Sequence, residues 1–328
     1  MSDDSSTDST DRNLALETVR VTEAAALAAS QFMGGGDEKS ADQAAVAAMH
    51  KALNRITVDG TVRIGEGQQG ETEKLYVGEN LGTGEGPKVD IALVALEGTS
   101  IVARGGPNAL SVIAMAEEGG FLTVPNIYMD KIAIGPGLPD GVVDLDNEPA
   151  ENLKSLAEAR GVAVADLVVC MLDRPRHAEL IAKIREAGAR IRLILDGDVS
   201  GIIAATQPEA GVDIFMGIGG APQGVLAAAA LRGVGGQMQG RLVFRNNDER
   251  AEAQSLGIED PKRKYSVQDM ASGNVTFAAT GVTYSAMLEG VRHVPGGAIT
   301  NSMVLRSMTG TIRFIEGHHD FIRWPAKS

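Results

Sequence analysis

The chain has 328 residues, of which 44% are hydrophobic and 22% charged, a composition typical of a globular protein with one large or two modest cores. Its formal net charge of −13 and aromatic fraction of 4% argue against the cationic, ring-rich surface that binds nucleic acid. Only one cysteine, Cys170, is present, which excludes a disulfide framework, and no apolar run has membrane-spanning length. We therefore expect a cytoplasmic protein with neither nucleic acid nor a membrane as its partner.

The N-terminal region begins with a polar, acidic stretch that predicts a disordered leader over residues 1–12. The Ala- and Leu-rich run that follows predicts a helix over residues 14–33, ended by three consecutive glycines. A Ser-x-x-Gln pattern at Ser40 then predicts a capping box and the start of a second helix. This assignment puts Asp42 in the first helical turn, where the helix dipole stabilises a carboxylate.

Two short predicted strands are each followed closely by an acidic residue. Residues 61–64 run into Glu66, and residues 89–94 run into Glu97. Magnesium and manganese prefer oxygen ligands, and strand ends face the crevice of an α/β sheet. Together with Asp42, these acids are candidate metal ligands, and for each of them a solvated surface carboxylate is the alternative interpretation.

The second half of the chain has the pattern of a β-α-β unit. A strand at 167–172, a helix at 176–187 and a strand at 190–195 follow one another through short connections, which predicts a parallel sheet. From this change of pattern we place a boundary between an N-terminal α+β domain, residues 13–160, and a C-terminal α/β domain, residues 161–328.

Three loops in this half carry residue types that bind anions or sugars. The loop 219–222 follows a strand predicted at 212–216 and precedes a helix, so its backbone N–H groups suit an anion, although a structural turn is an equal alternative. Arg174 and Arg176 present planar guanidinium groups suited to phosphate, unless they belong to a solvated turn. The sequence Asp196-Gly197-Asp198 could hold sugar hydroxyls or a metal, and it is also a frequent turn.

Near the C-terminus, residues 303–307 and 311–315 flank Thr309-Gly310 and predict a hairpin. No serine-hydrolase elbow, nucleotide-binding P-loop or Cys/His nucleophile pattern is present in the sequence. The residues by themselves therefore predict an α/β protein with acidic strand ends and one anion-binding loop.

A series of motif blocks extends from about residue 11 to residue 320. The blocks are Arg20–Ala28, Asp59–Thr61, Ile64–Gly67, Val77–Glu79, Gly82–Gly86, Val89–Ala92, Leu96–Thr99, Tyr128–Lys131, Arg174–His177, Asp196–Val199, Gly219–Pro222 and Ala279–Thr283. In this order they resemble the class II fructose-1,6-bisphosphatases, members of the lithium-sensitive sugar phosphatase superfamily. The resemblance implies a layered α-β-α-β-α sugar phosphatase fold with two domains. It also implies hydrolysis of the 1-phosphate of fructose 1,6-bisphosphate, in gluconeogenesis or the Calvin cycle, with sedoheptulose 1,7-bisphosphate as a second candidate substrate.

The resemblance further implies a role for each matching residue. The implied ligands of Mn²⁺ or Mg²⁺ are Asp42, Glu66, Glu97 and the residue at position 223. Thr99, beside Glu97, is implied to orient the attacking water. The implied substrate contacts are Gly98, Tyr128, Arg174, Arg176, Asp196, Asp198 and Gly220. Relatives of this kind assemble as homo-oligomers, so a dimer or tetramer is expected.

Two departures from the family pattern fall on implied metal ligands. Val94 stands where the pattern Asp-Pro-Leu-Glu-Gly-Thr begins with aspartate, and Gln223 replaces the glutamate of Gly-Gly-Ala-Pro-Glu-Gly. Losing two carboxylates weakens the attraction for a divalent ion by about several kcal/mol in a partly dry site, so we expect reduced metal occupancy. A working phosphatase with Asp90 or Glu71 as substitute ligand is one hypothesis. The other is a catalytically impaired homologue that binds sugar phosphate or regulates an active sibling subunit.

Overall fold

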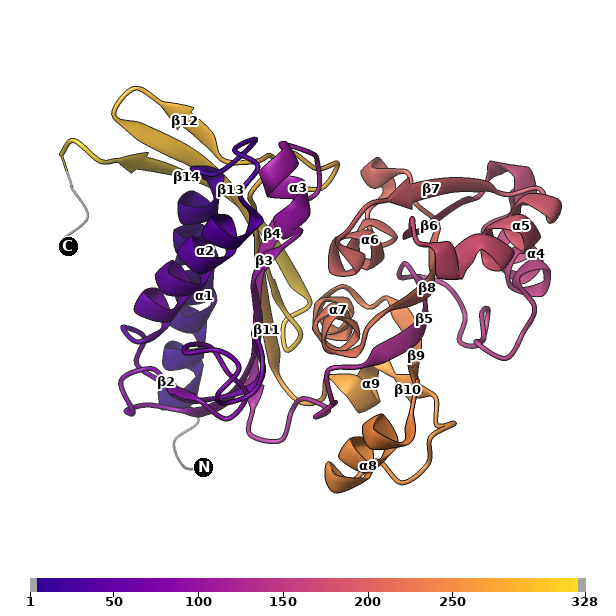
Figure 1. Ribbon diagram of the computed structural model, residues 1–328, viewed down its shortest axis with the longest axis horizontal. Helices are drawn as coiled ribbons and strands as arrows, with labels where there is room; N and C mark the ends of the chain where they lie inside the picture. The colour runs from indigo at the N-terminus through magenta and orange to yellow at the C-terminus, as the bar shows by residue number, and fades with distance from the viewer. Residues whose placement is uncertain (1–4, 324–328) are drawn as a thin grey trace. The chain divides into compact units, whose positions relative to one another are not determined.

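The computed structural model describes residues 5–323, with side chains from residue 14 onward, and its elements are labelled in Figure 1. The chain divides into two compact units. Unit 1 comprises Met1–Gly119 together with Gly273–Ser328, and unit 2 comprises Gly120–Ser272. Within the described residues, no helix is long and apolar enough to cross a bilayer.

Unit 1 is a mixed sheet with helices packed on it. Its elements are α1 (Ser5–Ser30), α2 (Glu38–Leu53), β1 (Asp59–Ile64), β2 (Asn80–Leu81), β3 (Lys88–Glu97), α3 (Thr99–Arg104), β4 (Leu110–Glu117), β11 (Val275–Gly281), β12 (Arg292–Val294), β13 (Gly297–Arg306) and β14 (Thr311–Asp320). The strands lie in the order β12-β13-β11-β4-β3-β1-β2, and β14 pairs with β13. Only β1 and β3 run parallel among these pairs, while the other neighbours are antiparallel.

Helices α1 and α2 lie side by side against this sheet (Figure 1). On α2 the buried residues Ala41, Ala45, Met49 and Leu53 recur every four positions and form one apolar stripe. Small alanines on both helices let the backbones approach closely, which produces a continuous core with the apolar strands β3 and β4. The sheet therefore holds α2, and with it Asp42, in a fixed position.

The helix starts differ from the sequence predictions. Helix α1 begins at Ser5, so residues 5–12 are helical instead of forming a disordered leader, and residues 1–4 lie outside the described residues. The N-cap of α2 is Asp37, whose carboxylate accepts the backbone N–H of Ser40 at 3.0 Å, so the predicted capping box at Ser40 is wrong. Because α2 starts at Glu38, Asp42 lies beyond the first turn, where the helix dipole contributes little.

Unit 2 is a sheet with helices on both faces. Its elements are β5 (Tyr128–Ile134), α4 (Pro149–Arg160), β6 (Val168–Leu172), α5 (Ala178–Glu186), β7 (Arg190–Ile194), α6 (Asp198–Ala204), β8 (Ile214–Gly220), α7 (Ala221–Val234), β9 (Gln237–Val243), α8 (Asn247–Ser255), β10 (Tyr265–Ser266) and α9 (Val267–Met270), with short 3₁₀ turns at Val164–Asp166, Pro175–His177 and Pro208–Ala210. The strand order is β10-β9-β5-β8-β6-β7. Helices α4 and α5 cover one face, and α6 and α7 cover the other (Figure 1).

The predicted β-α-β unit is confirmed, because β6 and β7 pair in parallel through α5. The C-terminal hairpin is confirmed as well, since β13 and β14 pair in antiparallel register up to Arg306 opposite Thr311. The predicted loop after residue 216 is partly strand, because β8 continues through Gly220 in register with β5. Both sheets with their helices fit the α/β fold class expected from the sequence.

The boundary expected near residue 160 does not coincide with the two compact units. It lies inside unit 2, because β5 pairs with β8 and β9 and so belongs to that unit despite preceding the β-α-β pattern by more than thirty residues. The C-terminal hairpin, in turn, completes the sheet of unit 1 through the β11–β13 pairing.

Unit 2 is an insertion into unit 1, and both ends of the insertion are tied. Within unit 2, the N–H of Ser272 donates to the carbonyl of Gly120 at 2.8 Å. Within unit 1, β4 and β11 are paired up to Val275 opposite Ala116, so the strands that flank the insertion are neighbours. The chain therefore leaves and re-enters unit 1 at adjacent points.

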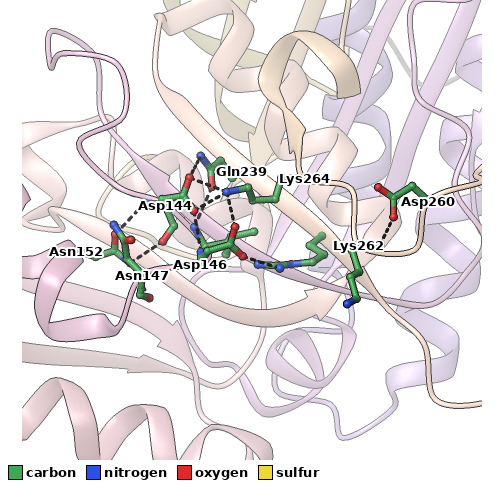
Figure 2. A network of polar contacts seen from close by, with 10 residues as sticks. Asp144, Asp146, Asn147, Asn152, Gln239, Asp260, Lys262 and Lys264 are labelled. Carbon is green, nitrogen blue, oxygen red and sulfur yellow. Dashed lines mark hydrogen bonds and ion pairs between the residues drawn. The ribbon is translucent and has the colours of Figure 1, made fainter.

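A long connection in unit 2, residues 135–148, is pinned by the polar network of Figure 2. Lys264 donates to both carboxylate oxygens of Asp144 at 2.6 and 2.8 Å and pairs with Asp146 at 2.7 Å. Gln239 donates to Asp144, and Arg241 to Asp146. These contacts join the connection to β9 and to the residue before β10.

Candidate active site

The metal-ligand candidates of unit 1 meet at the end of β1 and β3. Glu66 follows β1, and its Oε1 accepts the backbone N–H of Ala95 on the neighbouring strand at 2.6 Å. This bond fixes the Glu66 carboxylate beside the very stretch of β3 that contains Val94.

Asp42 and Glu66 are close enough for their charges to interact. Burial raises the pKa of Glu66 to about 7, the Ala95 N–H acts in the opposite direction, and the negative charge of Asp42 raises it further. Burial also raises the pKa of Asp42. Two partly buried, mutually repelling carboxylates destabilise each other unless a proton or a cation lies nearby. The structure therefore brings together two of the acids that the sequence suggested as metal ligands.

The end of β3 is irregular between Val94 and Glu97. The register with β4 shifts there, from Val94 opposite Val112 to Glu97 opposite Leu110. Val94 is half-buried and Glu97 is 5% exposed. Such a bulge changes the direction in which side chains point and is frequent beside functional sites.

Gly98 ends this strand and caps helix α3. Its φ of 90° lies in the left-handed region, and an added Cβ would come within 3.0 Å of the Ile101 side chain, so only glycine fits without strain. The turn puts Thr99 at the first position of α3, directly after Glu97-Gly98. The sequence order Glu-Gly-Thr thus encodes a strand-to-helix corner.

The substitute ligands considered for the missing aspartate are committed elsewhere or exposed. Asp90 is 1% exposed and accepts hydrogen bonds from Arg63 at 2.8 Å and from the N–H of Gly119 at 2.7 Å. It also precedes Val94 by four residues of extended strand, about 13 Å. Glu71 is exposed and accepts the N–H of Gln68 at 2.9 Å. Asp90 is therefore already bound by two donors and lies too far along the strand to replace a carboxylate at position 94. For Glu71 the substitution stays a prediction.

In unit 2, the candidate substrate contacts lie along one edge of the sheet, formed by the carboxyl ends of its parallel strands. Arg174 and Arg176 follow β6, Asp196 and Asp198 follow β7, and Gly220 ends β8. These three strands are parallel neighbours, with Leu172 opposite Ile194, so their carboxyl ends lie together. This edge is where open α/β sheets bind ligands.

Tyr128 is flanked by two guanidinium groups. It begins β5 in direct register with Gly220 of β8 and with Val243 of β9. The Arg176 guanidinium carbon lies 4.8 Å from the centre of the Tyr128 ring, and that of Arg245 lies 5.3 Å from it. Arg176 also donates to the carbonyl of Ile218 at 2.7 Å, which holds it at the strand edge. Arg245 also donates from Nε to the Glu249 carboxylate at 2.6 Å, which offsets its charge, so Arg176 is the guanidinium group better suited to bind a phosphate here.

A buried lysine and two glycines complete this edge. The ammonium group of Lys131 donates to Asp198 and to the carbonyl of Gly220, the latter at 3.0 Å. The amide oxygen of Gln223 folds over Gly220, in the space that a Cβ at Gly220 would need. Asp198 is 5% exposed and begins α6.

His177 holds the turn that carries Arg176. Its Nδ1 bonds the carbonyl of Leu172 at 2.7 Å, and its Nε2 accepts the N–H of Ile218 at 2.8 Å, which requires the neutral ring with the proton on Nδ1. Burial, first of all, lowers the pKa of His177. A cavity of about 300 Å³ opens beside this turn, lined by residues that include Asp130, Leu145, Arg176 and Lys183.

Each unit thus brings its own candidate residues together. Unit 1 brings Asp42 close to Glu66 and carries Glu97, Gly98 and Thr99 at the end of β3, and unit 2 holds the expected substrate contacts at its strand ends, with Gln223 over Gly220. Sequence reasoning gave no role to Lys131 or Arg245, because neither lies in a loop after a parallel strand. The fully buried charge of Lys131 would have needed a strand assignment for β5, which the sequence patterns did not provide.

A sequence profile of the bacterial fructose-1,6-bisphosphatases, glpX-encoded, matches residues 12–319. The chain belongs to this family. Curated relatives agree with the assignment along nearly the whole chain. A protein of Trichodesmium erythraeum (strain IMS101), named D-fructose 1,6-bisphosphatase class 2/sedoheptulose 1,7-bisphosphatase, is 40% identical over 95% of this chain and 97% of its own length. A protein of the same name from Synechococcus sp. (strain JA-2-3B'a(2-13)) is 42% identical over 94% and 96% respectively.

Fructose-1,6-bisphosphatases of this family are metal-dependent. The donors in unit 1 fit a divalent cation in kind, because they are carboxylate oxygens that repel one another in the absence of a positive charge. They fit less well in number. Among residues 5–323, no group of three or more His, Cys, Asp or Glu side chains is arranged to hold a metal ion, and Val94 has no donor atom.

Proposed function

We propose that this chain removes the 1-phosphate of fructose 1,6-bisphosphate, with sedoheptulose 1,7-bisphosphate as a second candidate substrate. Family membership over residues 12–319 supports the reaction class. The single observation that supports the proposal for this chain is the strand-end edge of unit 2, where Arg176 and Arg245 flank Tyr128 beside Gly220.

The residues of unit 2 bind and orient the sugar phosphate. Guanidinium groups present paired donors to phosphate oxygens, and the Arg176 side chain is already held at the carbonyl of Ile218. Arg174, at the same strand end, adds a third positive charge. Asp196 and Asp198 are placed to accept hydrogen bonds from sugar hydroxyls.

The residues of unit 1 act on the phosphate that leaves. Thr99, at the corner formed by Gly98, orients the attacking water through its hydroxyl, and Glu97 accepts a proton or holds a cation beside it. A Mn²⁺ or Mg²⁺ ion would be held in unit 1 by Asp42, Glu66 and Glu97, whose carboxylate oxygens are the donors such ions prefer. When bound, it neutralises phosphoryl charge and lowers the pKa of coordinated water.

A second function has a specific observation in its favour. Val94 and Gln223 remove two negative charges from the expected ligand set, and Asp90 cannot compensate for them. With the sugar-phosphate contacts preserved, a catalytically impaired homologue would still bind substrate. It could then act as a sugar-phosphate-binding or regulatory subunit beside an active sibling.

Release of inorganic phosphate from fructose 1,6-bisphosphate, measured at saturating Mn²⁺, tests the proposed function. Turnover that is abolished in Glu97→Gln supports the phosphatase, and the matched variant Glu316→Gln on the exposed strand β14 should leave the rate unchanged. No turnover together with calorimetric binding of the bisphosphate establishes the second function instead. Neither turnover nor binding refutes both.

We propose further that the protein is cytoplasmic and assembles as a dimer or tetramer. Cys170 is the one cysteine of the sequence and is buried in a strand. Burial raises the pKa of its thiol to about 12, which makes the thiol unreactive towards disulfide formation in the folded chain. The ten-residue strand β14 pairs with β13 along one edge and carries the exposed side chains Ile312 and Phe314. Exposed apolar edge strands of this length favour pairing with another chain.

A further inference from the structure

Lys131 is fully buried in the centre of unit 2, with 0% of its surface exposed. It lies on β5, three residues after Tyr128, and its side chain reaches the face of the sheet that α6 and α7 cover. Its ammonium group donates to the Asp198 carboxylate, at the start of α6, and to the Gly220 carbonyl, 3.0 Å away at the end of β8.

The glycines of the segment 219–224 make room for this side chain. A Cβ at Gly219 would collide with the Asp198 carboxylate and lie 2.8 Å from the Lys131 nitrogen. A Cβ at Gly224 would lie 3.3 Å from Cδ of Lys131 and 2.5 Å from the sulfur of Met129. The aliphatic stem of Lys131 thus runs past two positions at which a larger residue would displace it.

A buried ion pair is an expensive way to stabilise a protein. Removing both charges from water costs several kcal/mol per ion, and apolar residues of similar volume often stabilise a fold equally well or better. A function of this ion pair in ligand binding therefore explains its presence better than a contribution to folding stability does.

Both partners of Lys131 are expected substrate contacts. The Gly220–Ala221 peptide is held from two sides, because its carbonyl accepts from Lys131 and its N–H donates to the carbonyl of Ile127 at 2.8 Å. Asp198 is held by the same ammonium group. One cation therefore sets the position of a carboxylate that faces sugar hydroxyls and of the backbone at the anion-binding strand end.

Lys131 also changes the electrostatics of this edge. An unpaired carboxylate at position 198 would repel a phosphorylated ligand, and the repulsion between unit charges is strong where solvent is excluded. Paired with Lys131, the Asp198 carboxylate can accept hydroxyl hydrogen bonds without adding net negative charge. The same contact therefore orients the carboxylate and lowers its repulsion of phosphate.

We propose that Lys131 is a positioning residue for the sugar-phosphate site, which it serves through Asp198 and Gly220 and not by contact with substrate. This inference rests on the proposed function in so far as unit 2 binds a sugar phosphate. It assigns the glycines at 219 and 224 the role of accommodating the Lys131 side chain.

Calorimetric titration of fructose 6-phosphate into the full chain, in EDTA, tests this role without metal or turnover. Lys131→Met keeps the length and removes the charge, and we expect the dissociation constant to rise at least tenfold. Asp198→Asn should weaken binding as well. In the double variant, losing Lys131 should cost less than it does alone, because its main partner is already gone. Arg160→Met, which removes the Arg160–Asp213 ion pair elsewhere in unit 2, should bind like the unmodified chain.

The outcomes separate the inference from the proposed function. If the unmodified chain does not bind fructose 6-phosphate at millimolar concentration, the proposed sugar-phosphate site itself fails. If it binds and a folded Lys131→Met variant binds within twofold of it, or if the two single effects multiply fully, the positioning role is overturned. Should Lys131→Met not fold, the double variant, which has no unpaired charge, is compared with Asp198→Asn. Affinities within threefold support the role, and loss of binding in the double variant alone refutes it.

Discussion

The Oε1 atom of Glu66 accepts the backbone N–H of Ala95, the residue directly after Val94, at 2.6 Å. The Glu66 carboxylate is thereby held at the backbone of β3, one residue from Val94. Burial, and to a smaller extent the negative charge of Asp42, raises the pKa of Glu66 to about 7.

Glu66→Gln should stabilise the metal-free protein at alkaline pH. A carboxyl whose pKa is raised by folding favours the folded state less and less as pH rises from the unfolded pKa towards the folded one. Glutamine keeps the acceptor for Ala95 and removes the charge. We expect a gain of up to about 3 kcal/mol at pH 8 but only about 1 kcal/mol at pH 5. Urea unfolding in EDTA at both pH values measures this difference, and an equal gain at both would contradict the assigned cause.

Val94→Asp should restore affinity for manganese. The substitution adds a fourth carboxylate to the proposed ligands Asp42, Glu66 and Glu97, and each added charge strengthens binding of a divalent ion in a partly dry site. We expect at least tenfold tighter binding by calorimetry and faster phosphate release. Val94→Asn has the same shape without the charge and is the matched control. Equal affinities for the two variants would show that charge at position 94 is not what the site lacks.

Replacing His177 should reduce the loss of folding stability that the protein shows as pH falls below about 6.5. Burial lowers the pKa of His177 from 6.5, so the unfolded chain takes up a proton that the folded chain resists, and stability is lost as pH falls below that value. His177→Phe leaves the Leu172 carbonyl and the Ile218 N–H without their partner, at a cost of roughly 2 to 4 kcal/mol at pH 7.5. The cost should be smaller at pH 5.5. His318→Asn, at a side chain 68% exposed, serves as control and should show no such change.

Charges on β14 should dissociate the proposed oligomer. Ile312 and Phe314 are 43% and 61% exposed on a strand that, among residues 5–323, pairs with another strand along one edge only. Lysine at both positions should oppose pairing of this edge with a second copy. Sedimentation velocity of Ile312→Lys/Phe314→Lys is expected to give a monomer where the unmodified chain gives a dimer or tetramer. Met308→Lys, at an exposed turn position, should sediment like the unmodified chain, and an unchanged coefficient for the double variant would exclude this edge as the interface.

The parts of the fold that follow from neighbouring residues could be predicted from the sequence. The β6-α5-β7 unit and the β13–β14 hairpin are local, so periodicity and turn residues were sufficient. The domain limits could not be found this way, because they depend on which strands β5 and β11 choose as partners far along the chain. The start of α2 was misplaced because the capping-box pattern predicts that the backbone N–H of Ser40 donates to a side chain further along the helix. In the structure, the Asp37 carboxylate accepts this N–H instead.

The candidate site divides in the same way. Acids and arginines at strand ends could be identified from the sequence, since a strand followed by glycine or proline is a local signal. Lys131 could not be identified, because the role we propose for it depends on its contacts with Asp198 and Gly220, which lie 67 and 89 residues away in sequence. The idea that Asp90 replaces the missing carboxylate failed for a related reason, as only the folded sheet brings Arg63 and Gly119 to it.

Unit 2 is inserted between two strands of unit 1 that pair with each other. The protein can therefore be divided at the two ends of unit 2 without interrupting either sheet. A fragment spanning residues 120–272 retains its own core, and a short peptide could join residue 119 to residue 273 in the remainder. The acids around Glu66 would then belong to one polypeptide, and the arginines around Tyr128 would belong to another. Chimaeras that exchange the inserted segment with that of a relative would test whether unit 2 sets the sugar preference and unit 1 performs the hydrolysis, as we propose.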